Sequence, residues 1–402
     1  RLLYSTYDLT PMLKEGKNDI CAQLGAGWFS DFTGFATDWQ DQFGTQLTLM
    51  AKIVIKYTDG SSETIITDDK WLANDSGPIL SNSMQNGEDY DARREDYAGE
   101  WYPVSIYPAP KAEICAYVGS AARHNITLTA QSVSEPLPGV FVYDMGQNMV
   151  GVPHILLHGK EGQEITFRYG EMIYPDNVPE DPMPPLTAEV YAAKRGQVYY
   201  ENYRGALSTD HYICAGKPEG EIFSPHFTFH GYRYVAITGI DYPLPLEDVK
   251  GFVINSIGSK CDSDLQTSDA NVNRLFSNIV WGQRGNFVSI PTDCPQRDER
   301  MGWLNDCTVR IEEIVYNFGV SSFLRKWMRD IDDTQGEDGA IADVAPKVYG
   351  CDKADPLSSI FLFAPWNMYK FYGDKRIIEE QYIIAEKILK ENISRCKTFN
   401  YC

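Results

Sequence analysis

The stretch that organises this chain reads PTDCPQRDERMGWLND and occupies residues 291–306. It carries six ionisable side chains, while Pro291, Pro295 and Gly302 prevent one continuous helix. Its side chains can therefore converge from a folded loop instead of spreading around a cylinder. Converging carboxylates suit acid–base chemistry, because like charge keeps one carboxyl group protonated while a neighbouring arginine holds another ionised. The same composition also fits a solvated surface loop with ion pairs.

The hydrophobic pattern differs between the two sides of residue 255. Downstream, apolar residues recur with a period of about 3.6, which predicts amphipathic helices. The expected helices span residues 270–282, 306–318, 323–330, 360–372 and 375–394. Upstream, short alternating segments separated by Gly, Asn, Pro and Asp predict strands. The loop at 291–306 thus lies between the first two helices of a helical part that follows a β part.

The β part divides into two expected domains. Residues 1–110 are expected to form an N-terminal accessory β-sandwich, with a hairpin whose strands lie at 47–57 and 63–67. Prolines at 103, 108 and 110 indicate a stiff connector, so residues 111–135 are interpreted as a linker. Residues 136–254 are expected to form a second, concanavalin-like β-sandwich, with an exposed proline-rich loop at 176–185. Strands of this second domain are expected at 140–143, 152–157, 164–169, 227–229 and 234–237.

Composition excludes several classes of protein. The 402 residues are 43% hydrophobic, which is enough for sizeable cores, and the net charge of −20 repels nucleic acid and anionic membrane surfaces. No apolar run approaches the roughly 18 residues of a membrane helix, so a soluble protein is expected. The chain starts at Arg1 without signal-peptide features, and the compartment stays open, with a cytoplasmic location favoured. The oligomeric state is not predicted.

The cysteine pattern argues against a metal or disulfide framework. Nine cysteines are scattered without a CxxC pair, which favours reduced thiols over a zinc site or a disulfide scaffold. No DxDxDG-type calcium loop is present. We therefore expect neither a metal nor a cofactor.

The run DCPQRDERMGWLND at 293–306 resembles the signature of the bacterial α-L-rhamnosidase family. These inverting glycoside hydrolases place an (α/α)6 catalytic barrel, a six-hairpin glycosidase domain, after β-sandwich domains. Further blocks are similar to the family's other domains in the same order: 7–10, 16–28 and 69–71 in the accessory domain, and 143–151, 168–171 and 227–235 in the concanavalin-like domain. The resemblance covers nearly the whole chain. It implies the fold just described, with residues 255–402 supplying the first half of the barrel.

The resemblance also implies a reaction and its residues. It implies hydrolysis of terminal, non-reducing α-L-rhamnosyl groups of a glycoside, oligosaccharide or polysaccharide, with inversion. Glu299 would be the general acid, protonated beside ionised aspartates. Asp293, Arg297 and Asp306 would bind the sugar's hydroxyl groups, and Trp303 would pack against its ring or methyl face.

Two departures from the family pattern bear on these expectations. The family's general base is a Glu in the later half of the barrel, so we expect this chain to be a fragment without its C-terminal part, which leaves helix faces without partners. Residues 354–359 lack the tryptophan that many relatives place there, which weakens any inferred substrate preference. Two alternatives stay open: a non-catalytic carbohydrate-binding protein with a vestigial half-barrel, and a barrel that cuts another glycosidic bond.

Overall fold

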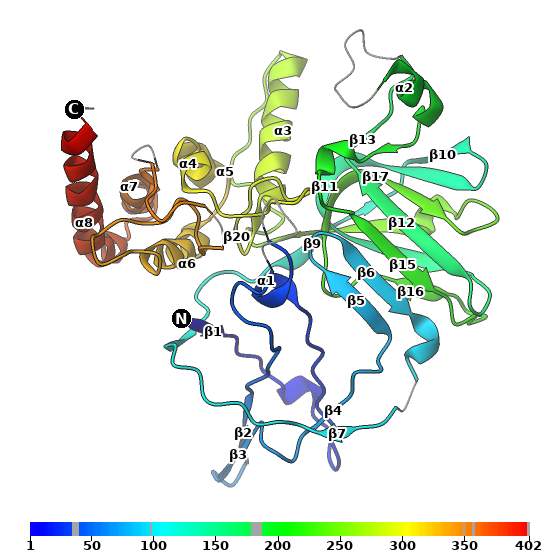
Figure 1. The fold of residues 1–402 in the computed structure, drawn as a ribbon, viewed down its shortest axis with the longest axis horizontal. Helices are drawn as coiled ribbons and strands as arrows, with labels where there is room; N and C mark the ends of the chain where they lie inside the picture. The colour runs from blue at the N-terminus through cyan, green and yellow to red at the C-terminus, as the bar shows by residue number, and fades with distance from the viewer. Residues whose placement is uncertain (34–39, 97–98, 178–186, 349, 356–357, 400–402) are drawn as a thin grey trace.

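The computed structural model describes residues 1–33, 40–96, 99–177, 187–348, 350–355 and 358–399. Three parts follow one another along the chain. Small β ladders near the N-terminus lie below a large curled sheet, and a group of helices lies beside that sheet (Figure 1). The expected order, β-rich parts followed by a helical part, is confirmed.

The large sheet contains ten strands and forms the concanavalin-like part. Its main path runs β5 (Ile79–Ser83), β6 (Gly87–Asp91), β15 (Thr209–Ile213), β12 (Glu164–Gly170), β17 (His230–Thr238), β11 (Val140–Leu157), β18 (Val249–Asn255) and β9 (Arg123–Thr129), with β10 (Ser132–Leu137) and β16 (Glu221–Phe223) also pairing with β11. The sheet packs around a core rich in aromatic rings, among them Tyr143, Phe167 and Tyr232. Alternating burial along β12 and β18 matches the period-two pattern of the sequence.

Strand β11 joins two segments that the sequence analysis treated as separate strands. It is 18 residues long, and its register against β17 shifts between Asp144 and Met149. Gly146 sits in this irregularity with φ +76°, and its amide donates to Oδ1 of Asp144 at 2.7 Å. A residue without a Cβ suits that left-handed turn.

The sheet takes in strands from outside the range expected for this domain. Strands β5 and β6 come from the expected N-terminal domain, and β6 pairs in parallel with β15. The range 111–135, interpreted as a linker, contains β9, which pairs with β18 over Arg123–Thr129, and the start of β10. The linker interpretation rested on the prolines at 103, 108 and 110, which lie before this range and do not prevent residues 123–129 from pairing with β18.

The N-terminal part consists of short ladders. Strand β2 (Lys52–Lys56) pairs with β3 (Ser62–Ile66), as the hairpin pattern predicted. Strand β1 (Leu2–Tyr4) pairs with β8 (Ile114–Ala116), and β4 (Leu72–Ala73) pairs with β7 (Tyr102–Pro103). Within the described residues each of these ladders has two strands, so a closed two-layer sandwich is not seen there. The short helix α1 (Gly27–Ser30) reaches from this part towards the helices (Figure 1).

The helical part begins after β18. Its helices are α3 (Ala270–Gly285), α4 (Leu304–Thr308), α5 (Ile311–Asn317), α6 (Ser321–Asp332), α7 (Ile360–Tyr372) and α8 (Lys375–Phe399), while α2 (Ala188–Lys194) belongs to the β region. The expected helix at 306–318 is divided, because the Arg310 amide closes a tight turn on the carbonyl of Cys307. Helix α7 has the expected bounds and ends at Gly373, which has φ +67°.

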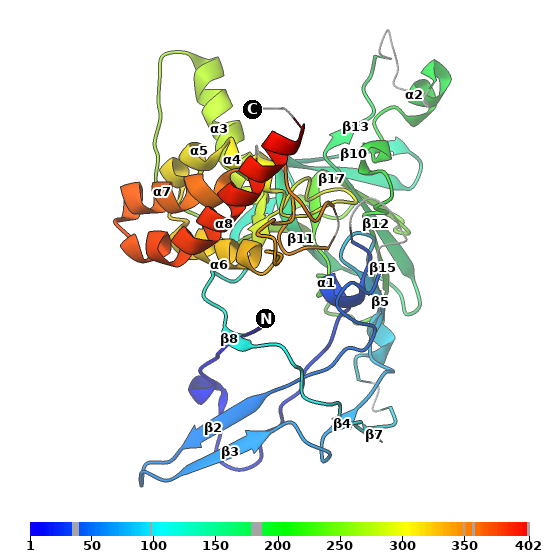
Figure 2. The same cartoon turned by 60° about the vertical axis from the view of Figure 1, so that its left-hand side comes forward.

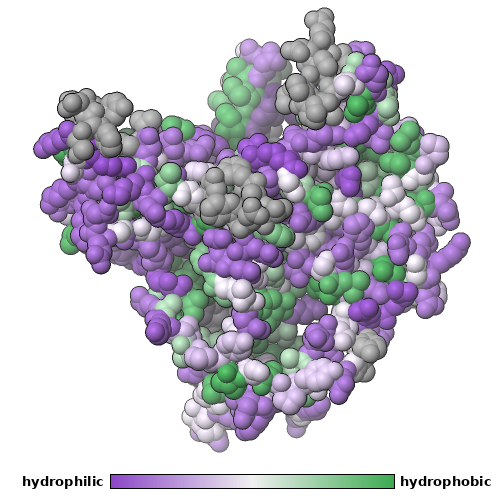
Figure 3. Space-filling view, in the orientation of Figure 1, coloured by the Kyte–Doolittle hydropathy of each residue, from purple (hydrophilic) through white to green (hydrophobic). Residues whose placement is uncertain are grey.

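The helices pack around Trp327, Leu324 and Phe318, all fully buried. Helices α7 and α8 lie side by side in Figures 1 and 2 and are in contact. Their outer faces expose large apolar side chains, namely Phe363, Trp366, Tyr382, Ile383 and Ile393. Apolar side chains also show along α3 in Figure 3, where Val272 and Leu275 are exposed. Exposed apolar patches of this kind usually mark surfaces that contact another protein segment.

Within the described parts of the chain, none of the helices has both the length and the apolar character that crossing a bilayer requires. The eight cysteines in these parts are all free thiols. Most of the proline-rich loop expected at 176–185 lies outside the described residues.

Candidate active site

The loop at 292–303 is folded by its own backbone. It leaves the short hairpin of β19 (Phe287–Val288) and β20 (Ile290–Pro291) and ends at α4. The Asp293 amide donates to the carbonyl of Met301 at 2.8 Å, and the Arg300 amide donates to the carbonyl of Asp293 at 2.9 Å. These two bonds join the start and end of the loop. The loop therefore brings Asp293 and Glu299 together although they lie six positions apart in the sequence.

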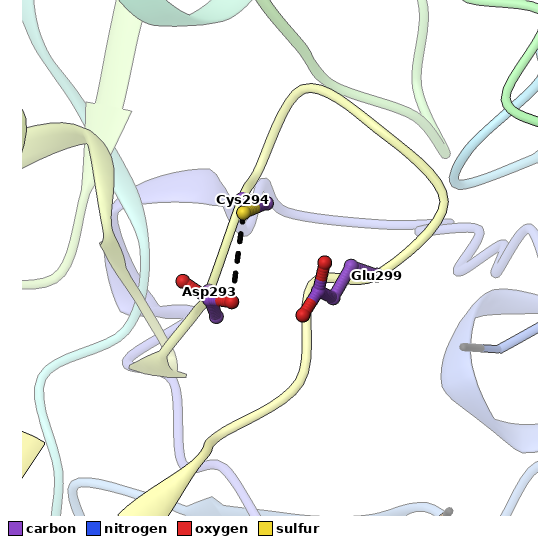
Figure 4. A group of neighbouring side chains, drawn as sticks. All are labelled: Asp293, Cys294 and Glu299. Atoms are coloured by element: carbon purple, nitrogen blue, oxygen red, sulfur yellow. Dashed lines mark hydrogen bonds between the residues drawn. The ribbon is translucent and has the colours of Figure 1, made fainter. Parts of the chain in front are cut away.

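The centre of the loop is a pair of carboxyl groups. One oxygen each of Asp293 and Glu299, together with Sγ of Cys294, lie within 4.8 Å of one another (Figure 4). Glu299 is buried, with 4% of its surface exposed. The Cys294 thiol donates to Oδ2 of Asp293 at 3.5 Å. Neighbouring acidic groups are common in proteins without a metal, and we assign none to them.

Three cationic or N–H donors point at Glu299. Arg297 approaches Oε2 with Nη2 at 2.9 Å and Nε at 3.1 Å. Arg204, which comes from the concanavalin-like part, places Nη2 2.9 Å from the same oxygen. The indole Nε1 of Trp303 donates to the other oxygen, Oε1, at 3.1 Å. Both oxygens of Glu299 are thus held as acceptors.

This arrangement sets the protonation of the pair. Burial, contact with Glu299 and the charges of Glu299 and Asp306 raise the pKa of Asp293 to about 6. Burial would also raise the pKa of Glu299, but the hydrogen bonds from Asp293 and Arg204 and the charge of Arg297 outweigh it and lower that pKa. The sequence argument placed the proton on the glutamate and the charge on the aspartates. In the structure the directions are opposite: the pKa of Asp293 is raised, and a hydrogen bond from Asp293 together with two facing guanidinium groups lowers that of Glu299.

The five residues singled out from the sequence lie around one centre. Asp306 is exposed in the first turn of α4, and its charge acts on Asp293. Trp303 is half-buried and packs against a small apolar cluster of Met301, Val344 and Val348. Trp28, from α1, packs against the same cluster, so the N-terminal part contributes to this wall of the site.

Sequence reasoning missed the contribution of Arg204. Its contact with Glu299 spans 95 residues and two parts of the fold. A lone arginine in a turn carries no sequence signal of such a contact. Asp298, which the sequence marked only as one charge among several, lies beside it, with Oδ1 2.7 Å from Nε of Arg204.

Arg300, a residue of the loop, connects the loop to other segments of the chain. Its side chain is fully buried, and Nη1 donates to the carbonyls of Met84 at 2.5 Å and Phe229 at 2.8 Å. The guanidinium also stacks over the Phe229 ring at 4.7 Å. One side chain thereby ties the loop to both preceding parts of the chain.

A second polar group, around His230, is structural. His230 is fully buried, lies 3.0 Å from Asp210 and 3.2 Å from Ser208, and stacks on Tyr169. The order of these groups resembles a nucleophile–base–acid relay, but Ser208 has no exposed surface. His230 is therefore a buried, hydrogen-bonded core histidine.

A concanavalin-like sheet followed by helical hairpins, with a carboxyl pair in the first loop of the helical part, defines the class of six-hairpin glycosidases with β domains. Family models agree: an alpha-L-rhamnosidase N-terminal domain matches residues 1–125, a bacterial alpha-L-rhamnosidase concanavalin-like domain 135–255, and a bacterial alpha-L-rhamnosidase 6 hairpin glycosidase domain 261–400. The chain belongs to the bacterial α-L-rhamnosidase family.

Individual relatives agree with this assignment. An alpha-L-rhamnosidase of Streptomyces avermitilis is 36% identical over 391 residues, covering 94% of this chain and 36% of the relative. One from Formosa agariphila is 34% identical, covering 98% of this chain and 41% of the relative. The chain therefore spans well under half the length of these curated relatives.

Solved structures show the same fold. The crystal structure of the Streptomyces avermitilis alpha-L-rhamnosidase complexed with L-rhamnose has a TM-score of 0.79 and 34% identity, covering 91% of this chain and 34% of that one. The alpha-L-rhamnosidase from Dictyoglumus thermophilum has a TM-score of 0.80 and 33% identity, covering 89% and 39%.

Proposed function

We propose that this chain carries the general-acid half of an α-L-rhamnosidase site. The protein would hydrolyse terminal α-L-rhamnosyl groups of glycosides, oligosaccharides or polysaccharides with inversion, and Glu299 would protonate the departing oxygen. The observation that carries the proposal is the Asp293–Glu299 carboxyl pair, a half-buried and a buried group in the loop that matches the family signature. Relatives named alpha-L-rhamnosidase support the choice of sugar.

The pair can deliver one proton. The raised pKa of Asp293 favours a proton on that residue, in contact with Glu299. Sugar hydroxyl groups that donate to Asp293 would favour its charged form. The proton would then pass to Glu299, next to the leaving oxygen. Arg297 and Asp306 would bind further hydroxyl groups, and Trp303 would provide the apolar contact for the ring or the C6 methyl group.

Asp293 is unsuited to be the general base. An inverting glycosidase separates its two carboxyl groups by about 6.5–9.5 Å, so that a water molecule fits between them. The oxygens of Asp293 and Glu299 are within 4.8 Å, and direct contact leaves no space for the sugar and water. The base of the proposed reaction is therefore a carboxylate outside this pair.

A second candidate is carbohydrate binding without hydrolysis. The observation that favours it is the lowered pKa of Glu299, because an ionised carboxylate accepts hydrogen bonds from hydroxyl groups and cannot donate a proton. Both candidates predict binding of L-rhamnose, and only the first predicts bond cleavage.

Two measurements on one preparation of the full-length protein separate these functions. Calorimetric titration with L-rhamnose, L-fucose and D-glucose gives the sugar preference, and p-nitrophenyl glycosides of the same sugars give hydrolysis. Preference for rhamnose in both assays is the expected result. Rhamnose binding without any cleavage would favour the second candidate, while cleavage of a fucoside or glucoside alone would contradict the proposal.

A further inference from the structure

The turn that carries Arg204 is held from both sides. Tyr203, at the end of the 3₁₀ turn Glu201–Tyr203, is fully buried and donates to the carbonyl of Gly231 at 2.6 Å. Arg204 follows with φ +56° and ψ −111°, a backbone conformation that a non-glycine residue adopts at a cost. The surrounding contacts therefore determine where this guanidinium points.

The turn contacts both acidic residues at the tip of the loop. Arg204 places Nε 2.7 Å from Oδ1 of Asp298 and Nη2 2.9 Å from Oε2 of Glu299. Next to it, the Gly205 amide donates to Oδ2 of Asp298 at 3.0 Å. A Cβ at Gly205 would come within 2.8 Å of that oxygen, so this close approach needs a glycine. The Arg204 side chain is 38% exposed, whereas those of Asp298 and Glu299 are 8% and 5% exposed.

We propose that Arg204 is a positioning residue for the acid: the concanavalin-like domain reaches into the helical domain's site, fixes the Glu299 side chain and sets which carboxyl group of the pair carries the proton. This proposal rests on the proposed function, because that function gives Glu299 its role as the general acid. A bidentate guanidinium fixes both direction and charge, which an ammonium group does less well.

Other charged groups also lie around the Asp293–Glu299 pair, and the effect of Arg204 adds to theirs. From the loop itself come Arg297, Asp298 and the Cys294 thiol, and Asp306 comes from α4. Glu171, at the end of β12, faces Arg297 and has a pKa raised by burial, against hydrogen bonds from Asn148 and Gln296. Arg297 pairs with Glu299 from within the same loop, whereas Arg204 pairs with it from another domain.

The Trp303 indole provides a probe of the pair that needs no substrate, because its N–H is bonded to Glu299. The chain would be labelled with 5-fluorotryptophan, which gives eight ¹⁹F signals, and Trp303→Phe would assign the one that matters. A pH titration of this signal follows the ionisation of the pair. In the unaltered chain we expect a midpoint near the pKa of about 6 of Asp293.

Removing the Arg204 charge should move that midpoint. In Arg204→Met we expect it to rise by about one pH unit, because an opposite charge near a carboxyl group favours its ionised form. Arg204→Lys keeps a charge but loses the second contact, so we expect a smaller rise. The matched control is Arg233→Met: Arg233 is 36% exposed and forms its ion pair with Asp144, through Nη2 at 2.7 Å. In Arg233→Met the midpoint of the Trp303 signal should equal that of the unaltered chain.

An unchanged midpoint in Arg204→Met, or an equal rise in Arg233→Met, would overturn the proposal. If Arg204→Met does not fold, as the dispersion of the ¹⁹F signals would reveal, the test rests on Arg204→Lys, whose unchanged midpoint would overturn it equally. Because no glycoside is used, failure of the proposed rhamnosidase activity would leave this result intact and would be recognised separately in the sugar assays.

Discussion

Nε1 of Trp303 donates a hydrogen bond of 3.1 Å to Oε1 of Glu299, so the aromatic residue expected to contact the sugar also holds the expected acid. The expected apolar contact for the sugar, Trp303, and the expected proton donor, Glu299, are thereby directly hydrogen-bonded to each other. A change at either residue should affect both sugar binding and proton transfer.

Replacing Trp303 by Phe separates these two effects. Phenylalanine keeps an aromatic face but removes the N–H, so L-rhamnose binding should change little while proton transfer weakens. A hydrogen bond to a charged group contributes about 1.5–3 kcal/mol, which predicts a loss of roughly tenfold or more in turnover. Calorimetry and initial rates on the same samples measure the two effects. A large loss of binding with unchanged turnover would contradict the assignment of the hydrogen bond.

Replacing Glu299 by Gln should affect substrates according to their leaving groups. In the full-length protein, turnover of a rhamnosyl glucoside should fall by roughly 10² to 10⁴, because protonation of the leaving oxygen is lost. A p-nitrophenyl rhamnoside needs less protonation and should lose less. Initial rates of both substrates give the comparison, and an equal loss on both would argue against an acid role for Glu299.

The raised pKa of Asp293 predicts a specific dependence of stability on pH. Folding raises this pKa from its ordinary value near 3.8 to about 6, so the folded state binds the proton more tightly than the unfolded state. The contribution of Asp293 to the free energy of unfolding is therefore fully present below about pH 4 and is lost as the pH rises through about 6.

The variant Asp293→Asn keeps the shape of the protonated acid and does not titrate. Relative to the unaltered chain, it should gain stability as the pH rises from 4 to 7, with each unit of pKa difference corresponding to about 1.4 kcal/mol. Urea unfolding at several pH values measures this trend. Asp264→Asn, which changes an exposed carboxylate, should show no such gain, and a stability difference of Asp293→Asn that is independent of pH would refute the prediction.

Arg300 should matter for stability, because its removal leaves buried groups without partners. In Arg300→Met the carbonyls of Met84 and Phe229 lose their guanidinium donor, with an expected loss of about 2–5 kcal/mol in the free energy of unfolding. Urea unfolding provides the measurement. Arg376→Met, whose side chain is 72% exposed, should change stability by about 0.5 kcal/mol or less. Similar values for both variants would show that Arg300 does not tie the loop to the sheet.

Local patterns predicted much of this fold. The amphipathic period placed α7 at its observed bounds, and the Asp59-Gly60-Ser61 turn located the β2–β3 hairpin. The sequence also marked the loop whose residues Asp293 and Glu299 meet in the structure. These features depend on neighbours along the chain, where periodicity and turn chemistry carry the information.

Contacts between distant segments were not predictable in this way. Strands β5 and β6 join a sheet whose other strands begin at residue 123, and nothing in their own sequence specifies that pairing. Likewise, the proton on Glu299 was expected from the acid role that the family resemblance implies, and the contact of Arg204 with Glu299, 95 residues away, carried no sequence signal. Hydrogen bonds from Asp293 and Arg204 and the charge of Arg297 together lower the pKa of Glu299, and the contact with Arg204 forms only in the tertiary structure.

The most direct test of Glu299 as the acid is capture of the rhamnosyl group by azide. Azide would attack the anomeric carbon from the face opposite the leaving group and replace both the water and the base, while the departing alcohol still takes its proton from the acid. From an α-L-rhamnosyl glucoside, the chain should form β-L-rhamnosyl azide, detectable by NMR. Glu299→Gln should lose this product, and Asp264→Asn should retain it. Equal formation by the unaltered chain and Glu299→Gln, or no product from a folded chain that binds L-rhamnose, would contradict the central claim that Glu299 is the acid of a rhamnosidase.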